Sequence, residues 1–360
     1  MKKIVVKISS NLLNPDNEID VMEKVTKEIS ELRKKNIEVI VVTSGAVMHG
    51  VKTLGLDSKP ESLPMLQSCA AIGQISLMTR YQNTFAKYSL TPAQILVSTE
   101  DFKIRSRYLN LRNVVESLLD IGIIPVFNEN DSVNTKELKF GDNDHLSSLI
   151  TLMMNFELLI ILTDVNGFYD KDPKINPDAK LINIIDKFDD EYLNFASNTV
   201  SKFTTGGMRK KIESAGRATK GGVDVFIGNG FEISLLKIVN GTEIGTFIKS
   251  QNKNVQARQK WLGFSPSERG IVFVDEGAFR ALTQKNSSLL ASGIVSIDGN
   301  FGKGSLISVF YKDLKVAQGL TNYSSRDLLL IKGKKSSEFS NYLKTCDYQE
   351  VIHKNNMFLL

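Results

Sequence analysis

Two lysines of this chain lie at points where their charge could neutralise a bound anion. Lys7 closes the apolar run IVVKI, and small hydroxyl residues follow it, among them Ser10. Lys211 ends the segment TTGGMRKK, whose glycines would let the backbone approach a phosphate, while a lysine in the first turns of a helix adds a full charge to the helix dipole. A strand-end lysine and a glycine turn also have ordinary structural roles, so neither segment identifies a phosphate site alone.

Two polar loops add acidic and amide side chains. The first, NENDSV, directly follows the apolar run IIPVF and contains Asn128 and Asp131, whose donors and acceptors could bind the ammonium and carboxylate groups of an amino acid. The second, FGDND, opens the helical segment NDHLSSLITLMM with Asn143 and Asp144. A solvated turn is the alternative for the first loop, and helix capping is the alternative for the second.

Two further loops follow apolar strands. In TSGA, the Ser44 hydroxyl and the backbone amides of Gly45 and Ala46 could face an anion at the start of a helix, although a simple N-cap serine is the commoner meaning. Thr163 and Asp164 end the strand LLIILT and lead into a glycine-containing loop. These side chains become a site only if the fold gathers them.

Several kinds of active site are absent from the sequence. There is no GxxxxGK[ST] phosphate loop, no GxGxxG after the first strand and no GxSxG nucleophile motif. The three histidines are widely spaced and show no metal-ligand pattern. The lysines, glycines and acidic loops that remain suit phosphoryl transfer, in which a protein positions two anionic partners and neutralises the charge on the moving group.

The elements that must position these residues indicate an α/β fold. Short β-branched runs alternate with amphipathic segments over the first 250 residues, which predicts a mainly parallel sheet with helices on both faces. Ligands bind beyond the carboxyl ends of such strands, so the polar loops should meet at one edge. The predicted strands are residues 4–8, 39–43, 93–97, 123–128, 158–163 and 223–227, and the predicted helices are residues 21–35, 66–87, 107–120 and 143–154.

The pattern changes after residue 248, where SQNKNVQARQK is polar and lacks apolar periodicity. We therefore predict a first domain over residues 1–250, a linker over residues 251–259 and a small β-rich domain over residues 260–360. The short strands predicted there are residues 271–274, 293–297, 306–311, 315–319 and 328–331, with one helix over residues 277–284.

Composition is that of a packed globular protein, with 42% apolar and 24% charged residues. The net charge of +5 neither implies nor excludes a nucleic-acid partner. Cys69 and Cys346 form no CxxC pair, so we expect two reduced, buried thiols and a cytoplasmic location. The apolar stretch at the N-terminus is too short for a signal peptide or a membrane span.

The motifs, taken in order, resemble the glutamate 5-kinase family of the amino acid kinase superfamily over nearly the whole chain. They are VVK, TSGAV, AAIGQ, RYLNLRN, PVFNENDSV, FGDND, LLIILTDVNGFYDKDP and TTGGMRKK. The later segments RQKWLGF, VDEGAFRAL, SSLLASGI, GNFGKG, GLTNYSS and VIHKNNM look like the PUA domain that ends many members.

This resemblance implies a three-layer α/β/α sandwich that binds ATP and L-glutamate along one edge, with Mg²⁺ bridging the phosphates. The γ-carboxylate of glutamate would attack the γ-phosphate to give glutamyl 5-phosphate, the first step towards proline. The resemblance implies catalytic roles for Lys7, Lys211 and Asp144, with Asp144 orienting the lysines, and assigns no metal ligands. It implies that glutamate is bound by Ser44, Gly45, Ala46, Asn128, Asp131 and Asn143. It implies that ATP is bound by Lys7, Ser10, Thr163, Asp164, Thr205, Gly206, Gly207, Met208, Arg209, Lys210 and Lys211.

The sequence departs from the family pattern at two loops. Ser9 and Asn11 replace a glycine and a small hydroxyl residue after the first strand, and Thr204 replaces a glycine in the last loop. A side chain where phosphate usually meets bare backbone could alter ATP affinity. None of these changes removes a charged group.

Alternatives and partners also follow from the resemblance. A sister kinase acting on aspartate, N-acetylglutamate or a nucleoside monophosphate is the nearest rival, and the acidic loops favour glutamate. The family leads us to expect a homo-oligomer with proline as a feedback inhibitor and no membrane association. RNA binding by the C-terminal domain is the rival from another class, through Lys303, Lys312, Lys315, Lys332, Lys334 and Lys335.

Overall fold

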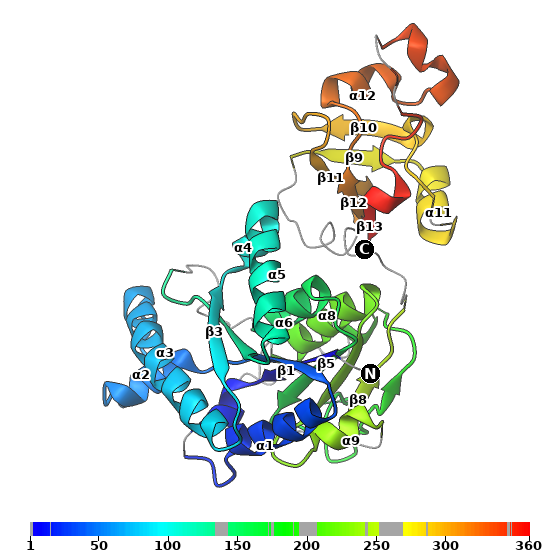
Figure 1. The fold of residues 1–360 in the computed structure, drawn as a ribbon. Coiled ribbons are helices and arrows are strands. Elements are labelled where there is room, and N and C mark those ends of the chain that lie inside the picture. Colours follow the sequence, from blue (N-terminus) through cyan, green and yellow to red (C-terminus); the bar gives the residue numbers. More distant parts are fainter. Residues whose placement is uncertain are drawn as a thin grey trace. The chain divides into compact units, whose positions relative to one another are not determined.

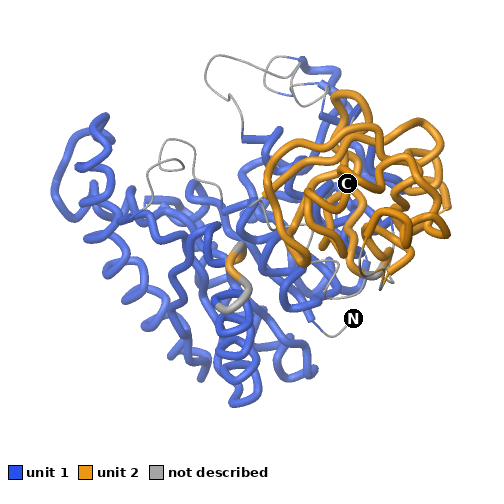
Figure 2. The backbone as a smooth tube through the Cα atoms, turned by 90° about the horizontal axis from the view of Figure 1, so that it is seen from above, with its two compact units in different colours: residues 1–101, 106–253 blue, residues 102–105, 254–360 orange. Residues whose placement is uncertain are grey.

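The computed structural model describes residues 3–14, 16–133, 143–171, 173, 176–189, 191–193, 207–241, 244–251, 269–285, 287–343, 346 and 348–360. The chain divides into two compact units, which Figure 2 colours separately. The first unit comprises Met1–Asp101 and Ser106–Lys253, and the second comprises Phe102–Arg105 and Asn254–Leu360. The predicted linker over residues 251–259 lies almost wholly outside the described residues, so its limits stay a prediction.

The first unit is built on one sheet. In the part of the chain that the structure describes, eight strands pair in the order β3-β4-β2-β1-β5-β7-β8-β6. All neighbours run parallel except β7 and β8, which are antiparallel. The strands are β1 (Lys3–Ile8), β2 (Glu38–Val42), β3 (Pro92–Val97), β4 (Ile124–Glu129), β5 (Leu158–Thr163), β6 (Ile184–Ile185), β7 (Asp224–Asn229) and β8 (Thr246–Ile248). The predicted mainly parallel sheet is confirmed.

Helices cover both faces of this sheet (Figure 1). Helices α1 and α9 lie on one side, and α6 and α8 lie on the other and pack against each other. The helices of this unit are α1 (Val21–Lys34), α2 (Ala46–Thr53), α3 (Leu63–Ala86), α4 (Thr99–Lys103), α5 (Arg105–Asp120), α6 (Asn143–Met153), α8 (Gly207–Lys220), α9 (Leu235–Val239) and the 3₁₀ turn η1 (Ser10–Leu13). The arrangement is the three-layer sandwich expected from the sequence.

The alternation of side chains along β1 decides where its lysine points. Ile4, Val6 and Ile8 pack into the apolar core shared with α1, because every second side chain of a strand faces the same side. Lys7 therefore points to the opposite face, against which α6 packs. The strand thus places a charged side chain beneath the helix layer that contains Asp144.

Two glycines allow α2 and α3 to touch through their backbones. A Cβ atom built on Gly50 would lie 1.9 Å from the carbonyl oxygen of Cys69, and one built on Gly73 would lie 1.9 Å from that of Ala46. Any larger residue at either position would force the helices apart. This contact fixes α3 beside the loop that carries Ser44.

The second unit contains a separate sheet in the order β10-β9-β11-β12-β13. Its strands are β9 (Ile271–Val274), β10 (Ile294–Asp298), β11 (Leu306–Tyr311), β12 (Leu314–Leu320) and β13 (Met357–Leu359). Helix α11 (Glu276–Lys285), helix α12 (Ser325–Ile331) and the 3₁₀ turns η2 (Ala291–Gly293), η3 (Ser336–Asn341) and η4 (Lys354–Asn356) complete the described part. The predicted β-rich domain is confirmed.

The strand predicted over residues 328–331 is wrong, because these residues end α12. Ser324 accepts a hydrogen bond from the backbone N–H of Asp327 and forms a capping box with it, which starts a helix. Leu328 and Ile331 are buried while Leu329 and Leu330 are exposed, a three-residue spacing typical of a helix face.

The cysteine prediction is half right. Cys69 is buried within α3, but Cys346 is exposed, so the expectation of two buried thiols is wrong for Cys346. Both cysteines are free. Among the described residues, no helix combines the length and apolar character needed to cross a bilayer.

Candidate active site

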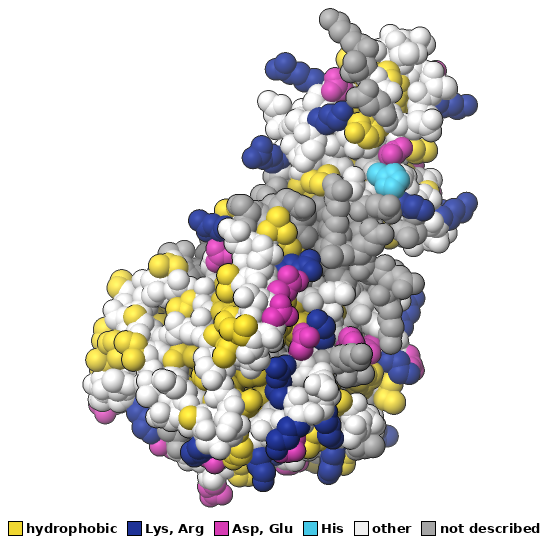
Figure 3. Space-filling view, viewed as in Figure 1, with side chains coloured by type: hydrophobic (Ala, Val, Ile, Leu, Met, Phe, Trp, Pro, Cys, Tyr) yellow, Lys and Arg dark blue, Asp and Glu magenta, His cyan; other side chains and the backbone are white. Residues whose placement is uncertain are grey.

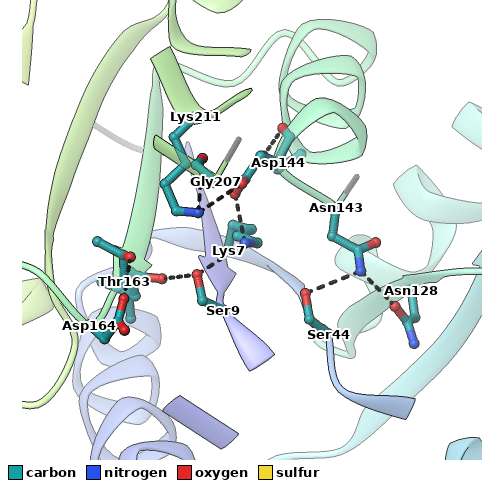
Figure 4. A network of polar contacts seen from close by, with 12 residues as sticks. Lys7, Ser9, Ser44, Asn128, Asn143, Asp144, Thr163, Asp164, Gly207 and Lys211 are labelled. Atoms are coloured by element: carbon teal, nitrogen blue, oxygen red, sulfur yellow. Dashed lines mark hydrogen bonds and ion pairs between the residues drawn. The ribbon is translucent and has the colours of Figure 1, made fainter. Parts of the chain in front are cut away.

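A carboxylate held between two lysines forms the centre of the site (Figure 4). The Nζ of Lys7 lies 2.6 Å from Oδ1 of Asp144, and the Nζ of Lys211 lies 3.1 Å from Oδ2 of the same carboxylate. The exposed fractions of the Lys7, Asp144 and Lys211 side chains are only 5%, 6% and 12%. The two lysines predicted to share one anion therefore do converge.

Three elements bring these groups together. Lys7 is near the end of β1, Asp144 is in the first turn of α6, and Lys211 is near the start of α8. A carboxylate at a helix N-terminus is stabilised by the helix dipole. Because α6 packs on both β1 and α8, its first turn reaches the two lysines at once.

The lysines determine the charge state of Asp144. Burial alone would raise the pKa of its carboxyl group, but the charges of Lys211 and Lys7 outweigh burial and lower that pKa to about 2. Asp144 is therefore ionised at neutral pH. The two ammonium groups and the one carboxylate together carry a charge of one positive unit in a nearly buried position, which suits a polyanionic ligand.

The loop after β1 tightens this arrangement. Ser9 Oγ accepts a hydrogen bond from Lys7 Nζ at 3.1 Å and donates one to the carbonyl oxygen of Leu162 at 2.8 Å. Asn11 Nδ2 donates to Asp164 Oδ2 at 3.2 Å. Ser9 and Asn11, the departures from the family pattern after the first strand, thus tie the ends of β1 and β5 together, and Ser9 turns its hydroxyl towards the lysine. Sequence reasoning predicted neither contact. The third departure, Thr204, lies outside the described residues.

The residues predicted to bind the nucleotide are only partly placed. Thr163 Oγ1 donates to Asp164 Oδ1 at 3.2 Å at the end of β5, and Ser10 lies in η1 beside it. Residues 207–211 form the start of α8, where Arg209 pairs with Glu213 at 2.9 Å. The predicted residues Thr205 and Gly206 lie outside the described residues, and the ATP-binding roles of Met208 and Lys210 stay predictions.

Amide and hydroxyl side chains form a second cluster beside the charged one. Asn143 Nδ2 donates to Ser44 Oγ at 3.1 Å and to Asn128 Oδ1 at 3.1 Å. The N-cap of α2 is Gly45, which has the left-handed φ of 100°. The alternative that Ser44 merely caps this helix is therefore wrong, because its hydroxyl instead accepts from Asn143.

The chain of hydrogen bonds continues into α3 and β3. Asn128 Nδ2 donates to Gln74 Oε1 at 2.8 Å, and Gln74 Nε2 donates to Gln94 Oε1 at 3.1 Å. Sequence reasoning missed both glutamines. The available signal was a glutamine directly after the apolar and small residues AAIG, a composition typical of a packed helix face. Gln74 is indeed buried, and a buried amide needs hydrogen-bond partners.

A hollow of about 280 Å³ opens beside these hydrogen-bonded amides, and Asp131 is part of its wall. The other residues around the hollow are Ala46, Ala70, Ala71, Gln74, Ile75, Gln94, Leu96, Glu129, Asn130 and Ser132. The fold therefore brings Ala46 and Asp131, two residues predicted to bind the substrate, to one small space.

Comparisons with known proteins agree with the arrangement. Residues 2–229 match the amino acid kinase family, and residues 270–343 match the PUA domain. The glutamate 5-kinase of Thermoanaerobacter sp. is 39% identical to this chain over 99% of its length and 98% of the relative. The glutamate 5-kinase of Caldanaerobacter subterraneus subsp. tengcongensis is 40% identical over the same shares. A carbamate kinase structure from Giardia lamblia, bound to AMP-PNP, matches 69% of this chain and 99% of its own with a TM-score of 0.50 and 17% identity, which supports the fold alone.

Proposed function

The chain belongs to the glutamate 5-kinase family of amino acid kinases, and from this premise we infer that it transfers the γ-phosphoryl group of ATP to the side-chain carboxylate of L-glutamate. The product is glutamyl 5-phosphate, and the reaction is the first step towards proline. One observation carries the inference for this chain. Lys7 and Lys211 converge on Asp144 directly beside the cluster of Ser44 and Asn143.

The two lysines neutralise the charge on the transferred group. Phosphoryl transfer needs little covalent help from a protein, but it needs positive charge fixed where negative charge is spread over the moving phosphoryl oxygens. Asp144 holds both ammonium groups in place before the substrates arrive, since each contacts one of its oxygens. The cations therefore do not have to reorganise during the reaction.

Glutamate is held on the other side of the charged cluster. The Oδ1 of Asn143 is buried and has no hydrogen-bond partner among the described residues, so it can accept a hydrogen bond from the substrate ammonium group. Asp131, at the wall of the hollow, supplies the opposite charge. Ser44 and the backbone amides of Gly45 and Ala46, at the start of α2, suit a carboxylate.

We propose that the nucleotide binds at the ends of β1 and β5 and at the start of α8, with contacts from Ser10, Thr163, Asp164 and residues 207–211. Thr205 and Gly206, which are also predicted to bind it, lie outside the described residues. Mg²⁺ would enter on the nucleotide and neutralise part of the charge on the β- and γ-phosphates. Both oxygens of Asp144 already contact lysines, so the phosphate oxygens would supply the ligands of the ion.

Location, regulation and partners extend the proposal. Two free cysteines suit the reducing cytoplasm, where we place the reaction. Proline shares the α-amino and α-carboxylate groups of glutamate, so we propose that it competes for the same side chains. A homo-oligomeric state remains a prediction from the family.

RNA binding by the C-terminal unit also remains a prediction. On the face drawn in Figure 3 the basic side chains of this unit stand apart from one another rather than in one continuous patch. Some of the lysines considered for RNA lie over aromatic rings, with Lys303 Nζ 4.6 Å from the ring centre of Tyr348 and Lys334 Nζ 5.3 Å from that of Tyr342. Salt-dependent retention of labelled structured RNA on filters would test this partner.

A substrate panel tests the proposed activity. Purified protein with ATP and Mg²⁺ is expected to release ADP and, with hydroxylamine present, to form the glutamyl hydroxamate when L-glutamate is supplied. L-aspartate, N-acetyl-L-glutamate and UMP serve as the rival acceptors. Turnover of any rival with none of L-glutamate would reject the proposed substrate.

A further inference from the structure

A backbone N–H group selects which way the amide of the Asn128 side chain faces. The N–H of Glu129 donates to Asn128 Oδ1 at 3.0 Å, and a backbone N–H can only donate. Asn128 must therefore turn its oxygen towards Glu129 and Asn143 and its NH₂ group towards α3. Reversing this amide would set two donors against each other in a site where Asn128 is 1% exposed.

Gln74 meets the NH₂ group of Asn128 with an acceptor. Its Oε1 lies 2.8 Å from Asn128 Nδ2, and its own Nε2 donates to Gln94 Oε1 at 3.1 Å. Gln74 is 8% exposed, so few waters can replace its oxygen. The side-chain amides of Asn128, Gln74 and Gln94 therefore form a series of hydrogen bonds in which each donates to the next.

The direction of these hydrogen bonds also sets the orientation of the Asn143 amide. Its NH₂ group donates to both Asn128 Oδ1 and Ser44 Oγ, and Figure 4 shows its oxygen pointing away from these two partners. Asn143 Oδ1 is buried and has no hydrogen-bond partner among the described residues. A buried acceptor without a donor is costly, so the site is poised to accept a donor group from a ligand.

We propose that Gln74 is a positioning residue: by accepting from the NH₂ group of Asn128, it holds this side chain in the orientation that the Glu129 N–H selects. Asn143 then presents its oxygen to the substrate, and the site selects an acceptor molecule that carries an α-ammonium group. The proposal rests on the proposed function, because it names a determinant of that same substrate site. Gln74 also lines the hollow that contains Asp131, so the oriented amide and the carboxylate can act on the same cationic group.

The test compares the loss and the restoration of one acceptor. Gln74→Leu and the less branched Gln74→Met remove the acceptor, while Gln74→Glu keeps an oxygen facing Asn128. We expect the KM for L-glutamate to rise about 10-fold or more in the first two variants, because a hydrogen bond to a charged group is lost. The value of kcat should fall less than about threefold in these two variants. In Gln74→Glu the KM for L-glutamate should return most of the way to the wild-type value.

A competitor without the amine separates positioning from general damage. Glutarate has the two carboxylates of glutamate but no ammonium group, so its inhibition constant should change less than about twofold in Gln74→Leu. Gln82→Leu, the same substitution at an exposed position of α3, is the matched control and should behave as wild type. Circular dichroism confirms folding, and Gln74→Met serves if Gln74→Leu does not fold.

The outcomes separate the two proposals. An unchanged KM in both Gln74→Leu and Gln74→Met, or a glutarate inhibition constant that rises in step with that KM, would overturn the role of Gln74. A failure of Gln74→Glu to restore the KM would overturn it as well. A wild-type protein that does not phosphorylate L-glutamate would instead overturn the proposed function.

Discussion

Lys7 and Lys211, from opposite ends of the first unit, contact different oxygens of one carboxylate. The distances to Asp144 are 2.6 Å for Lys7 and 3.1 Å for Lys211, and all three side chains are nearly buried. Removing either lysine leaves the other paired with Asp144, so the carboxylate keeps a partner. Removing one lysine should therefore lower the catalytic rate much more than the stability of the fold.

Lys7→Ala and Lys211→Ala should each lower kcat about 100-fold or more. A single preorganised charge at the transferring group is worth on the order of 3 kcal/mol in the transition state. Steady-state assays of ADP release, with circular dichroism to confirm folding, measure this effect. Lys249→Ala is the matched control, because Lys249 forms an exposed pair with Asp186 at 2.6 Å. Wild-type kcat in both site variants would remove the lysines from the mechanism.

Asp144 should make a pH-dependent contribution to stability. Its pKa is about 2 in the folded protein and 3.8 is its ordinary value, so the folded state favours the ionised form. The contribution, about 2 kcal/mol, is complete above pH 4 and disappears as the pH falls through 2. Denaturant unfolding of wild type and Asp144→Asn should therefore differ by a constant amount from pH 8 to 5, and the difference should shrink below pH 4. A gap that instead grows on acidification would contradict this charge assignment.

Asp131→Asn should weaken glutamate binding more than turnover. The carboxylate lines the hollow of about 280 Å³ beside Ala46 and Gln74, where we place the ammonium group of the substrate. Losing the charge but keeping the shape should raise the KM for L-glutamate about 10-fold, while the KM for ATP stays close to wild type. An equal rise in both Michaelis constants would argue that Asp131 supports the fold of the loop rather than the amino acid.

Local sequence pattern predicted the sheet and the meeting of its polar loops, whereas the contact of Asp144 with both lysines was implied only by the resemblance to the family. Lys7 lies near the end of a β-branched strand and Asp144 lies in the first turn of an amphipathic helix. Loops at the carboxyl ends of parallel strands meet by geometry. The partners of Ser9 and Gln74 depend on contacts between distant segments, and no periodicity encodes them. The strand predicted over residues 328–331 failed for a related reason, since a short apolar run fits a strand or a buried helix turn until its cap is recognised.

Ser9→Ala tests whether the hydroxyl after β1 supports the catalytic lysine. The change removes the contacts of Ser9 Oγ with Lys7 Nζ at 3.1 Å and with the Leu162 carbonyl at 2.8 Å but keeps the backbone. We expect a loss of about 1 to 2 kcal/mol in the free energy of unfolding and a several-fold lower kcat. Lys7 would retain its contact with Asp144, so the effect should be far smaller than that of Lys7→Ala. An effect as large as Lys7→Ala would mean that Ser9 contacts the substrates itself.

Gly73→Ala tests whether the contact between α2 and α3 holds the substrate loop in place. The new Cβ would lie 1.9 Å from the backbone oxygen of Ala46, and neither backbone can move aside without separating the helices. We expect about 1 to 3 kcal/mol of lost stability in denaturant unfolding. The KM for L-glutamate should also rise, because Gln74 and the Ser44 loop would move apart. Gly302→Ala is the matched control, since its Cβ would meet no atom within 4 Å. If Gly73→Ala loses stability while the KM keeps its wild-type value, the contact supports the fold alone and the substrate loop is held by other residues.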